Sequence, residues 1–327
     1  FGLERLSGSG ARLTFHLKPN ESTEAIFSIS AGIGEARPRA PRTYHERAQG
    51  ARREYRAWAQ SCTQFHSGHD RFDQSLAQSV ADLKALNVQH FGQQVISAGI
   101  PWYTCPFGRD ALITGFEALL ATPEVAREAL LFLARFQGKQ VDPFRDEEPG
   151  KIMHEIRIGE MAKANEVPHT PYFGSVDATP LFLILLSEYY LWTGDRDTVQ
   201  DLMPAAEAAL GWLDHYADRD GDGLVEYLRQ SPRGLRNQGW KDSHDGVPFA
   251  DGTTAEPPIA LVEVQGYVAD ARARMANLYR RLGRTADGVR QASIQGHRAR
   301  DFQHHDAQIF AVSTAPPIFA PQRFQKE

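Results

Sequence analysis

The stretch "ATPLFLILLSEYYLWTGDRDTVQDLMPAAEAALGWLDHY" (178–216) decides the fold, because it predicts two helices joined by a very short link. Residues 178–193 are apolar nearly all round, which is typical of a buried helix. The second half carries apolar residues at helical spacing: Val199, Leu202, Ala206, Leu210, Leu213 and Tyr216. The link is "GDRD" (194–197). A link this short makes the two helices antiparallel neighbours.

The same helical pattern extends to both sides of this pair. An apolar stripe runs through Phe72, Leu76, Val80 and Leu83. Further helices are expected over 110–120, over 123–136 with Pro123 in its first turn, and over about 258–282. The sequence therefore predicts six helices between residues 70 and 283.

The connections between these helices predict where a site lies. The helices at 110–120 and 123–136 are also joined by a short link, whereas the segments 88–108, 139–177 and 218–257 are long. Short links reverse the chain, so the three long connections fall at the same end of the helical array. Loops well over ~15 residues in a compact domain are usually functional. We therefore expect a site at the long-loop end.

The two ends of the chain differ from this helical region. Residues 11–30 predict two strands, around Leu13–Leu17 and Ile26–Ile29, with a turn at "PNES" (19–22). We expect residues 1–35 to be the end of a β-domain and residues 36–69 to form a charged linker helix at about 43–62. Residues 284–327 have no sustained apolar period and carry three prolines after 315, so we expect an irregular tail that is not native to the fold.

Composition excludes several classes of function. The formal charge of −5 with mixed signs gives no basic footprint for nucleic acid. The longest strongly apolar run, "LFLILL" (181–186), is far shorter than the ~20 residues of a membrane span. Cys62 and Cys105 lack the spacing of a metal site and fit a reduced compartment. We therefore expect a cytoplasmic protein that binds neither nucleic acid nor membranes.

The long connections place carboxylates among aromatic residues. The first ends in "AGIPWYTCPFGRD" (98–110), the second contains "PGKIMHEIRIGEM" (149–161), and the third contains "NQGWKDSHDG" (237–246). Sugar rings stack on aromatic faces, and their hydroxyls need acceptors and donors such as Asp and Arg. Glycosidic cleavage needs one protonated carboxyl group and a second carboxylate on the opposite face of the sugar. These loops therefore favour a carbohydrate site.

Four motifs, in this order, resemble those of one enzyme family: "FGRDALIT" (107–114), "GSVDATPLF" (174–182), "GWKDSHDG" (239–246) and "IALVEVQGYVADA" (259–271). The family is the bacterial amylo-α-1,6-glucosidases (glycogen debranching enzymes), which belong to the glucoamylase-like six-hairpin toroid glycosidases. The resemblance covers about 70–283. It implies a partial (α/α)6 toroid, with about six of twelve helices, preceded by the remnant of a β-sandwich-like domain. The implied activity is hydrolysis of an α-glucan oligo- or polysaccharide by an inverting acid/base mechanism, with no cofactor.

The resemblance also implies roles for individual residues. Asp242 matches the general acid, and Arg109 and Asp110 match the pair that binds the terminal glucose. Glu263 matches an acidic residue that lines the same pocket, and contacts with the substrate are also implied at Trp102 and Trp240. The resemblance implies such contacts more weakly at Glu155, Arg157 and Asp177. The catalytic base of the related enzymes comes from the second half of the ring, so no residue here is assigned that role.

Several of these residues also have a simpler interpretation. Asp110 is expected to cap a helix as well as bind sugar. Glu155 and Glu160 fit solvated loop charges equally well. His244 and Asp245 are expected to face solvent or to contact the substrate-binding residues without touching substrate. Trp192 and Trp212 are expected in the core. An unpaired carboxylate inside an apolar helix is costly, which favours a pocket position for Glu263.

The segment "DRDGDG" (218–223) matches the first half of an EF-hand loop through Asp218, Asp220 and Asp222. The twelfth position is Arg229, where a bidentate Glu belongs. A polar turn is the favoured interpretation, with calcium binding as the alternative.

The sequence is also compatible with other functions. A glycoside phosphorylase on the same toroid would use phosphate in place of water, and a non-catalytic carbohydrate-binding helical protein would need no acid. A terpene-cyclase-like toroid would have an aromatic pocket poor in Arg–Asp pairs. Residue types alone suit α-1,4-glucosidic, trehalose-like or mannosyl substrates as well as α-1,6-glucosidic ones.

The sequence also suggests that the chain is a fragment. It starts at Phe1 instead of methionine, and only half of the helices of a ring can be counted. We therefore expect the chain to be inactive alone and to expose the inner faces of its helices, including "LFLILL", as an apolar patch.

Overall fold

The computed structural model describes residues 2–5, 11–25, 43–284 and 309–310. Contacts divide the chain into two units, Phe1–Trp58 and Ala59–Glu327. Within the described residues, no helix is both long and apolar enough to cross a membrane.

The first unit contains a β-hairpin and most of a helix. Strand β1 (Gly2–Arg5) pairs antiparallel with β2 (Ala11–Thr14). The pairing of β2 with the preceding β1 was not expected, and the predicted second strand around Ile26–Ile29 lies outside the described residues. The expected turn is present, with Glu21 N–H donating to the Lys18 carbonyl. The linker helix is confirmed as α1 (Tyr44–Ser61), whose last residues belong to the second unit.

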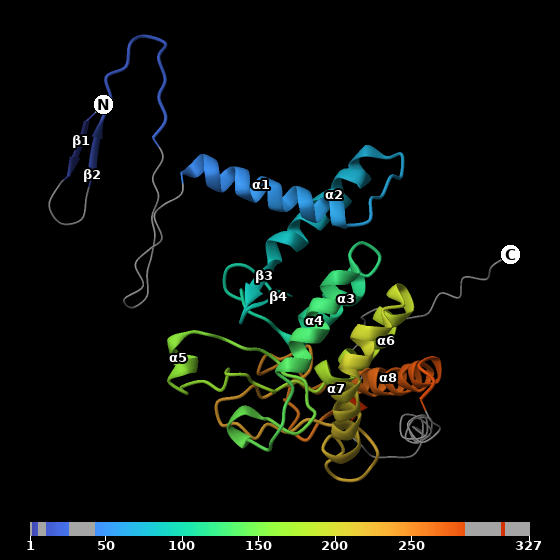
Figure 1. Ribbon diagram of the computed structural model, residues 1–327. Coiled ribbons are helices and arrows are strands. Elements are labelled where there is room, and N and C mark those ends of the chain that lie inside the picture. Colours follow the sequence, from blue (N-terminus) through green and yellow to red (C-terminus); the bar gives the residue numbers. More distant parts are fainter. Residues whose placement is uncertain (1, 6–10, 26–42, 285–308, 311–327) are drawn as a thin grey trace. The chain divides into compact units, whose positions relative to one another are not determined.

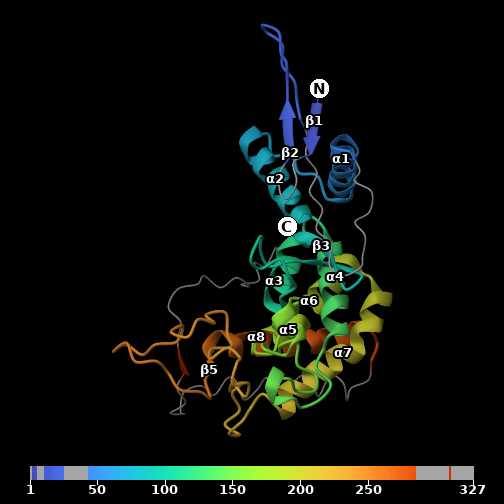
Figure 2. The same ribbon diagram turned by 90° about the vertical axis from the view of Figure 1, so that its left-hand side faces the viewer.

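The six expected helices of the second unit are all present (Figures 1 and 2). They are α2 (Asp70–Leu86), α3 (Gly108–Ala118), α4 (Pro123–Arg135), α6 (Ala178–Thr193), α7 (Arg196–His215) and α8 (Val262–Arg281). Shorter elements lie in the connections: β3 (Asn87–His90), β4 (Gln93–Ile96), a 3₁₀ turn (Pro143–Arg145), α5 (Glu160–Lys163), β5 (Ala260–Leu261) and β6 (Ile309–Phe310). The mainly helical fold is confirmed. The antiparallel pair β3–β4 was not expected.

Helix α6 is the centre of the core. It packs against α3, α4, α7 and α8, so apolar side chains are needed on every side of it. All six residues of "LFLILL" are buried, at 3% exposure or less. The expectation that this segment forms an exposed patch was therefore wrong, because its neighbours within the chain already cover it. Trp212 of α7 is buried as expected, whereas Trp192 is 52% exposed at the end of α6 and does not belong to the core.

The loop lengths alternate as the sequence predicts. Tight turns join α3 to α4 and α6 to α7, and Gly194 ends α6 in the left-handed conformation at φ 67°. In Figure 1 the long green loop after α4 and the long orange loop before α8 lie together at one end of these helices. A backbone hydrogen bond joins these two loops: Val176 N–H donates to the Gln238 carbonyl. The long connections therefore meet at one end of the array.

Gly108 begins α3 at a point where no side chain fits. A Cβ atom there would lie 2.1 Å from the Met153 carbonyl oxygen, and the Gly108 N–H donates to His154 at 2.7 Å. We expect Gly108→Ala to lower the free energy of unfolding by at least about 2 kcal/mol, since backbone must move. Gly211, inside α7, has open space around it. Gly211→Ala should instead stabilise the protein by about 0.5–1 kcal/mol. Urea denaturation of both variants tests this contrast, and equal effects would contradict it.

Candidate active site

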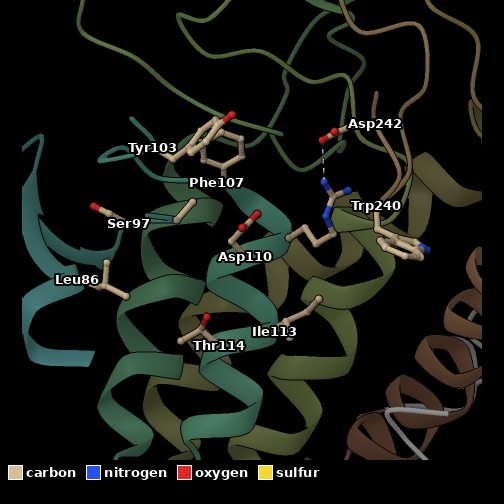
Figure 3. Close-up of a pocket in the computed structure, with 11 residues that line it drawn as sticks. Leu86, Ser97, Tyr103, Phe107, Asp110, Ile113, Thr114, Trp240 and Asp242 are labelled. Carbon is tan, nitrogen blue, oxygen red and sulfur yellow. Dashed lines mark hydrogen bonds and ion pairs between the residues drawn. The ribbon is translucent and has the colours of Figure 1, made fainter. Parts of the chain in front are cut away.

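Arg109 joins residues from three separate parts of the chain. It lies in the first turn of α3, and its NH1 is 2.8 Å from Asp177 Oδ2 at the start of α6. Its NH2 is 3.2 Å from Asp242 Oδ2, which comes from the third long connection (Figure 3). Asp177 is 2% exposed and also accepts a hydrogen bond from Ser175 Oγ at 2.6 Å. The convergence of Arg109, Asp177 and Asp242 at the long-loop end is as the loop lengths predict.

A pocket of about 560 Å³ opens beside this cluster. In Figure 3 the rings of Tyr103 and Phe107 lie on one side, Trp240 lies on the other, and Asp110 lies between them. The remaining lining residues come from α2, the loop after β4, α3 and the third long connection: Leu86, Ser97, Ala98, Arg109, Ile113, Thr114 and Asp242. Carboxylates and a guanidinium group therefore face the same cavity as three aromatic rings.

Asp110 faces the pocket but does not cap α3. The N-cap residue is Phe107, which makes no side-chain cap hydrogen bond, so the capping prediction was wrong. Asp110 lies in the first turn, where a negative charge interacts favourably with the helix dipole. Burial nevertheless raises the pKa of Asp110, and the charge of Arg109 only partly opposes this effect. Asp110 is a partly desolvated acceptor, as a sugar-hydroxyl contact requires.

Glu263 lies in the first turn of α8, and its Oε2 atom is buried without a hydrogen-bond partner. Burial raises the pKa of Glu263, and the charge of Asp177 raises it further, while Lys241 opposes the shift. Glu263 is absent from the pocket lining, yet its electrostatic coupling to Asp177 places it beside the same cluster. Within the described residues, one oxygen of this carboxylate is thus left without a partner, which costs stability and is typical of functional sites.

This position of Glu263 predicts a pH-dependent effect on stability. The pKa of Glu263 is higher in the folded chain than in the unfolded one. The wild type therefore loses stability as pH rises from the unfolded-state pKa to the folded-state pKa of this group. Glu263→Gln cannot ionise. Its melting temperature should exceed that of the wild type most at mildly alkaline pH, with the difference shrinking at acidic pH. Thermal melts across the pH range test this, with Glu117→Gln, at an exposed site on α3, as control. A difference that is constant with pH would contradict the prediction.

Besides Asp177 and Glu263, three expected substrate contacts lie outside the pocket lining: Trp102, Glu155 and Arg157. Trp102 is 81% exposed at the tip of its loop, and the adjacent Tyr103 lines the pocket in its place. Glu155 is buried and not solvated, and its Oε2 accepts from Arg157 Nε at 2.5 Å. Its Oε1 lies 3.3 Å from His169 Nε2. Glu155 and Arg157 therefore bind each other. Glu155 also forms β-bridges with Phe107 and Tyr172, which connects the first long connection to the second.

Other expectations concern exposed residues. His244 and Asp245 are exposed, as predicted. Glu160 is exposed at the start of α5. Asp218, Asp220 and Asp222 bring one oxygen each to within 4.8 Å of one another. Their side chains accept backbone N–H groups of the same turn, for example Gly221 N–H at 2.8 Å from Asp218 Oδ1. Calcium binding there stays a prediction that titration calorimetry with Ca²⁺ can test.

Two features of this end had no recognised signal in the sequence. Ser97 and Ala98 line the pocket because the β3–β4 hairpin and the residues after it fold back beside α2 and α3. A buried network around Asp146 fixes the loops that carry Asp177 and Asp242.

Comparisons with known proteins find several solved structures of similar fold, two of which follow. No protein-family model matches the sequence, and no curated protein matches it. One similar structure belongs to a family of metal-independent α-mannosidases, from Streptococcus pneumoniae, in a non-productive complex with α-1,6-mannobiose. It is 14% identical with a TM-score of 0.44, over 78% of this chain and 62% of that chain. The other is a family 76 glycoside hydrolase from a bovine Bacteroides thetaiotaomicron strain, 11% identical with a TM-score of 0.40, over 71% of this chain and 42% of that one. This chain thus spans less than two thirds of either.

Proposed function

We propose that this chain carries the acid side of a glycoside hydrolase site that cleaves terminal α-linked glucose, as amylo-α-1,6-glucosidases do. The observation that carries the proposal is the contact of Arg109 with both Asp177 and Asp242 beside a pocket with aromatic walls. A basic side chain clamped by two carboxylates is a rigid hydrogen-bonding surface for hydroxyl groups. Aromatic rings on both sides supply the apolar faces against which a sugar ring packs.

In this proposal each side chain has a separate task. Trp240 and Tyr103 hold the faces of the sugar, and Asp110 and Arg109 bind its hydroxyl groups. Asp242 donates the proton to the leaving glycosidic oxygen. It is 41% exposed, so a substrate can reach it, and it forms an ion pair with Arg109.

An inverting reaction also needs a base across the scissile bond, about 6.5–9.5 Å from the acid. We assign none of the described residues to that role. Hydrolysis is therefore expected from a protein that contains these residues together with such a base, and wild type denotes that protein wherever turnover is measured. Glu263 has a raised pKa and lies beside Asp177, which fits a substrate contact more closely than a base that must be charged.

The experiment is a hydrolysis assay over defined disaccharides with α-1,6-glucosidic, α-1,4-glucosidic, α,α-trehalose and α-1,6-mannosidic linkages, each with and without inorganic phosphate. We expect free glucose from the α-1,6-glucoside, at a rate independent of phosphate. Sugar phosphate formed only with phosphate would indicate a phosphorylase. Binding without cleavage would indicate a carbohydrate-binding protein, and free mannose alone would assign the site to mannosides.

A further inference from the structure

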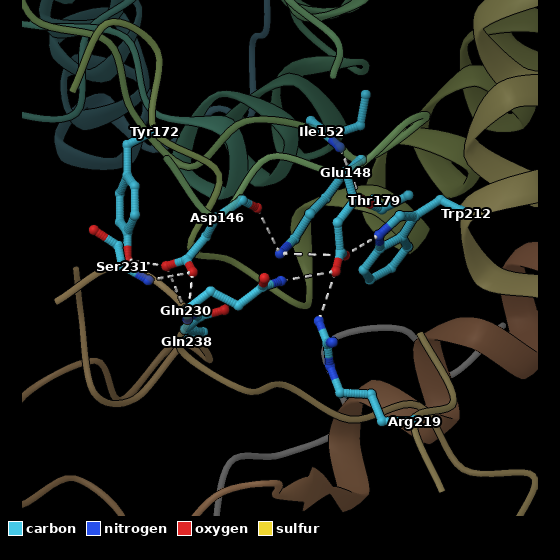
Figure 4. A network of polar contacts seen from close by, with 11 residues as sticks. Asp146, Glu148, Ile152, Tyr172, Thr179, Trp212, Arg219, Gln230, Ser231 and Gln238 are labelled. Carbon is cyan, nitrogen blue, oxygen red and sulfur yellow. Dashed lines mark hydrogen bonds and ion pairs between the residues drawn. The ribbon is translucent and has the colours of Figure 1, made fainter. Parts of the chain in front are cut away.

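A buried carboxylate outside the pocket lining organises the segment that leads to Asp242. Asp146 is 1% exposed, at the end of the 3₁₀ turn in the second long connection. Its Oδ1 accepts from the backbone N–H groups of Gln230, at 2.6 Å, and Ser231, at 2.9 Å. Its Oδ2 accepts from Tyr172 Oη at 3.0 Å and from Gln238 Nε2 at 3.1 Å (Figure 4). One carboxylate therefore holds both ends of the segment 230–238.

The middle of the same segment is fixed as well. Tyr172 Oη accepts from the Leu235 N–H at 2.7 Å, and Gly234 lies so close to Tyr172 that a Cβ atom would come within 2.5 Å of Oη. The Gln238 carbonyl accepts from Val176 N–H at 2.8 Å, one residue before Asp177. The segment 230–238 is thereby held in register with the start of α6, where Arg109 meets Asp177.

Asp242 itself has few constraints of its own. It is 41% exposed, and its neighbours His244 and Asp245 are exposed. Asn237 Nδ2 donates to the Ser243 carbonyl at 2.6 Å and closes the loop that carries Trp240 and Asp242. The position of this loop therefore depends on where residues 237 and 238 are held.

We propose that Asp146 is a positioning residue for the proposed acid: it holds the segment 230–238 so that Asp242 and Trp240 face Arg109. This inference rests on the proposed function for its catalytic readout. Asp146 does not touch the pocket, so its effect on the reaction passes through the loop alone.

Glu148 supplies a matched control inside the same network. It is 3% exposed, and it accepts from Trp212 Nε1 at 2.8 Å, Arg219 NH2 at 2.7 Å and Gln230 Nε2 at 3.2 Å. Its partners are side chains, whereas Asp146 binds the backbone of the segment. Glu148→Gln should therefore lower stability at least as much as Asp146→Asn while leaving residues 231–238 in place.

The test compares two substrates that differ in their need for acid. An α-1,6-linked disaccharide of the sugar selected by the hydrolysis panel needs a proton on its leaving oxygen, whereas the α-glycosyl fluoride of that sugar loses a stable anion. Asparagine at position 146 retains one acceptor but places an NH₂ group opposite other donors. We expect Asp146→Asn to lower kcat for the disaccharide about 10²-fold, the effect of a misplacement of ~1 Å, with little change in KM. The kcat for the fluoride should change little.

Tyr172→Phe is a second, milder variant, because it removes the hydroxyl group that joins Asp146 to Leu235 and leaves the two backbone contacts of Asp146 intact. It should change the ratio of the two kcat values in the same direction as Asp146→Asn, by a smaller factor. Glu148→Gln should leave this ratio unchanged. The inference is overturned if Asp146→Asn lowers kcat for the disaccharide and for the fluoride by the same factor. It is also overturned if Glu148→Gln changes the ratio of the two kcat values as Asp146→Asn does.

Amide hydrogen exchange of the same purified proteins provides a readout that does not depend on turnover. We expect Asp146→Asn to speed exchange in peptides that cover 230–243 and not in peptides of α8. Exchange equal to that of the wild type overturns the inference. A wild type that cleaves neither substrate contradicts the proposed function instead, and exchange alone then decides whether Asp146 holds this loop.

Discussion

Replacing Asp242 with asparagine is expected to lower kcat for an α-linked disaccharide about 10²- to 10⁴-fold, the usual contribution of a general acid. Asparagine keeps the shape of the side chain and its hydrogen bond to Arg109, so the pocket walls at Trp240 and Tyr103 remain. Sugar affinity should therefore change little, as measured by quenching of tryptophan fluorescence. Turnover of the α-glycosyl fluoride should be reduced much less than that of the disaccharide.

Asp245 provides the matched control for this substitution. It lies three residues further along the same loop, exposed and beside His244. Asp245→Asn should retain wild-type kcat with both substrates. Near-normal disaccharide turnover in Asp242→Asn would remove Asp242 from the acid role, and an equal loss in Asp245→Asn would show that charge on the loop, not proton donation, matters.

Arg109 should be the most important single side chain of the site for stability. Arg109→Met removes the partner of Asp177, a carboxylate that is almost fully buried. Breaking one side of a buried ion pair in this way costs about 3–5 kcal/mol, since a buried charge is left without compensation. Urea denaturation should show this loss, together with loss of sugar binding.

Two further variants serve as controls for the stability loss in Arg109→Met. Arg109→Lys keeps the charge but cannot form the forked contact with Asp177 and Asp242, so an intermediate loss is expected. Arg127→Met removes an exposed ion pair with Glu124 on α4 and should cost no more than about 1 kcal/mol. A loss at position 109 no larger than that at position 127 would contradict the clamped arrangement.

The sequence predicts the helical region because its signals are local. Apolar spacing and short links within 178–216 predict the α6–α7 pair, and the alternation of link lengths then places Arg109, Asp177 and Asp242 at the same end. Trp192 shows the limit of such reasoning, because an apolar residue on a nearly uniformly apolar helix has no periodic signal for which side is covered.

The parts that could not be predicted depend on contacts between distant residues. Asp146 binds Gln230 and Gln238, which lie 84 and 92 residues further along the chain. No local pattern distinguishes it from a solvated loop carboxylate. The same is true of Glu155, whose burial follows from its partners on two other loop segments. Loop residues acquire their surroundings only when the helices have brought the loops together.

Proton NMR of the wild-type protein with an α-1,6-linked glucose disaccharide tests the central claim most directly, because it detects bond cleavage and the configuration of the product in one spectrum. The proposed site predicts release of free glucose whose first-formed anomer is β, since inversion converts the α linkage. The signal should be independent of phosphate and greatly reduced in Asp242→Asn. Unchanged spectra for this disaccharide and for every other linkage in the panel would contradict the assignment of the long-loop end as a glycosidase site.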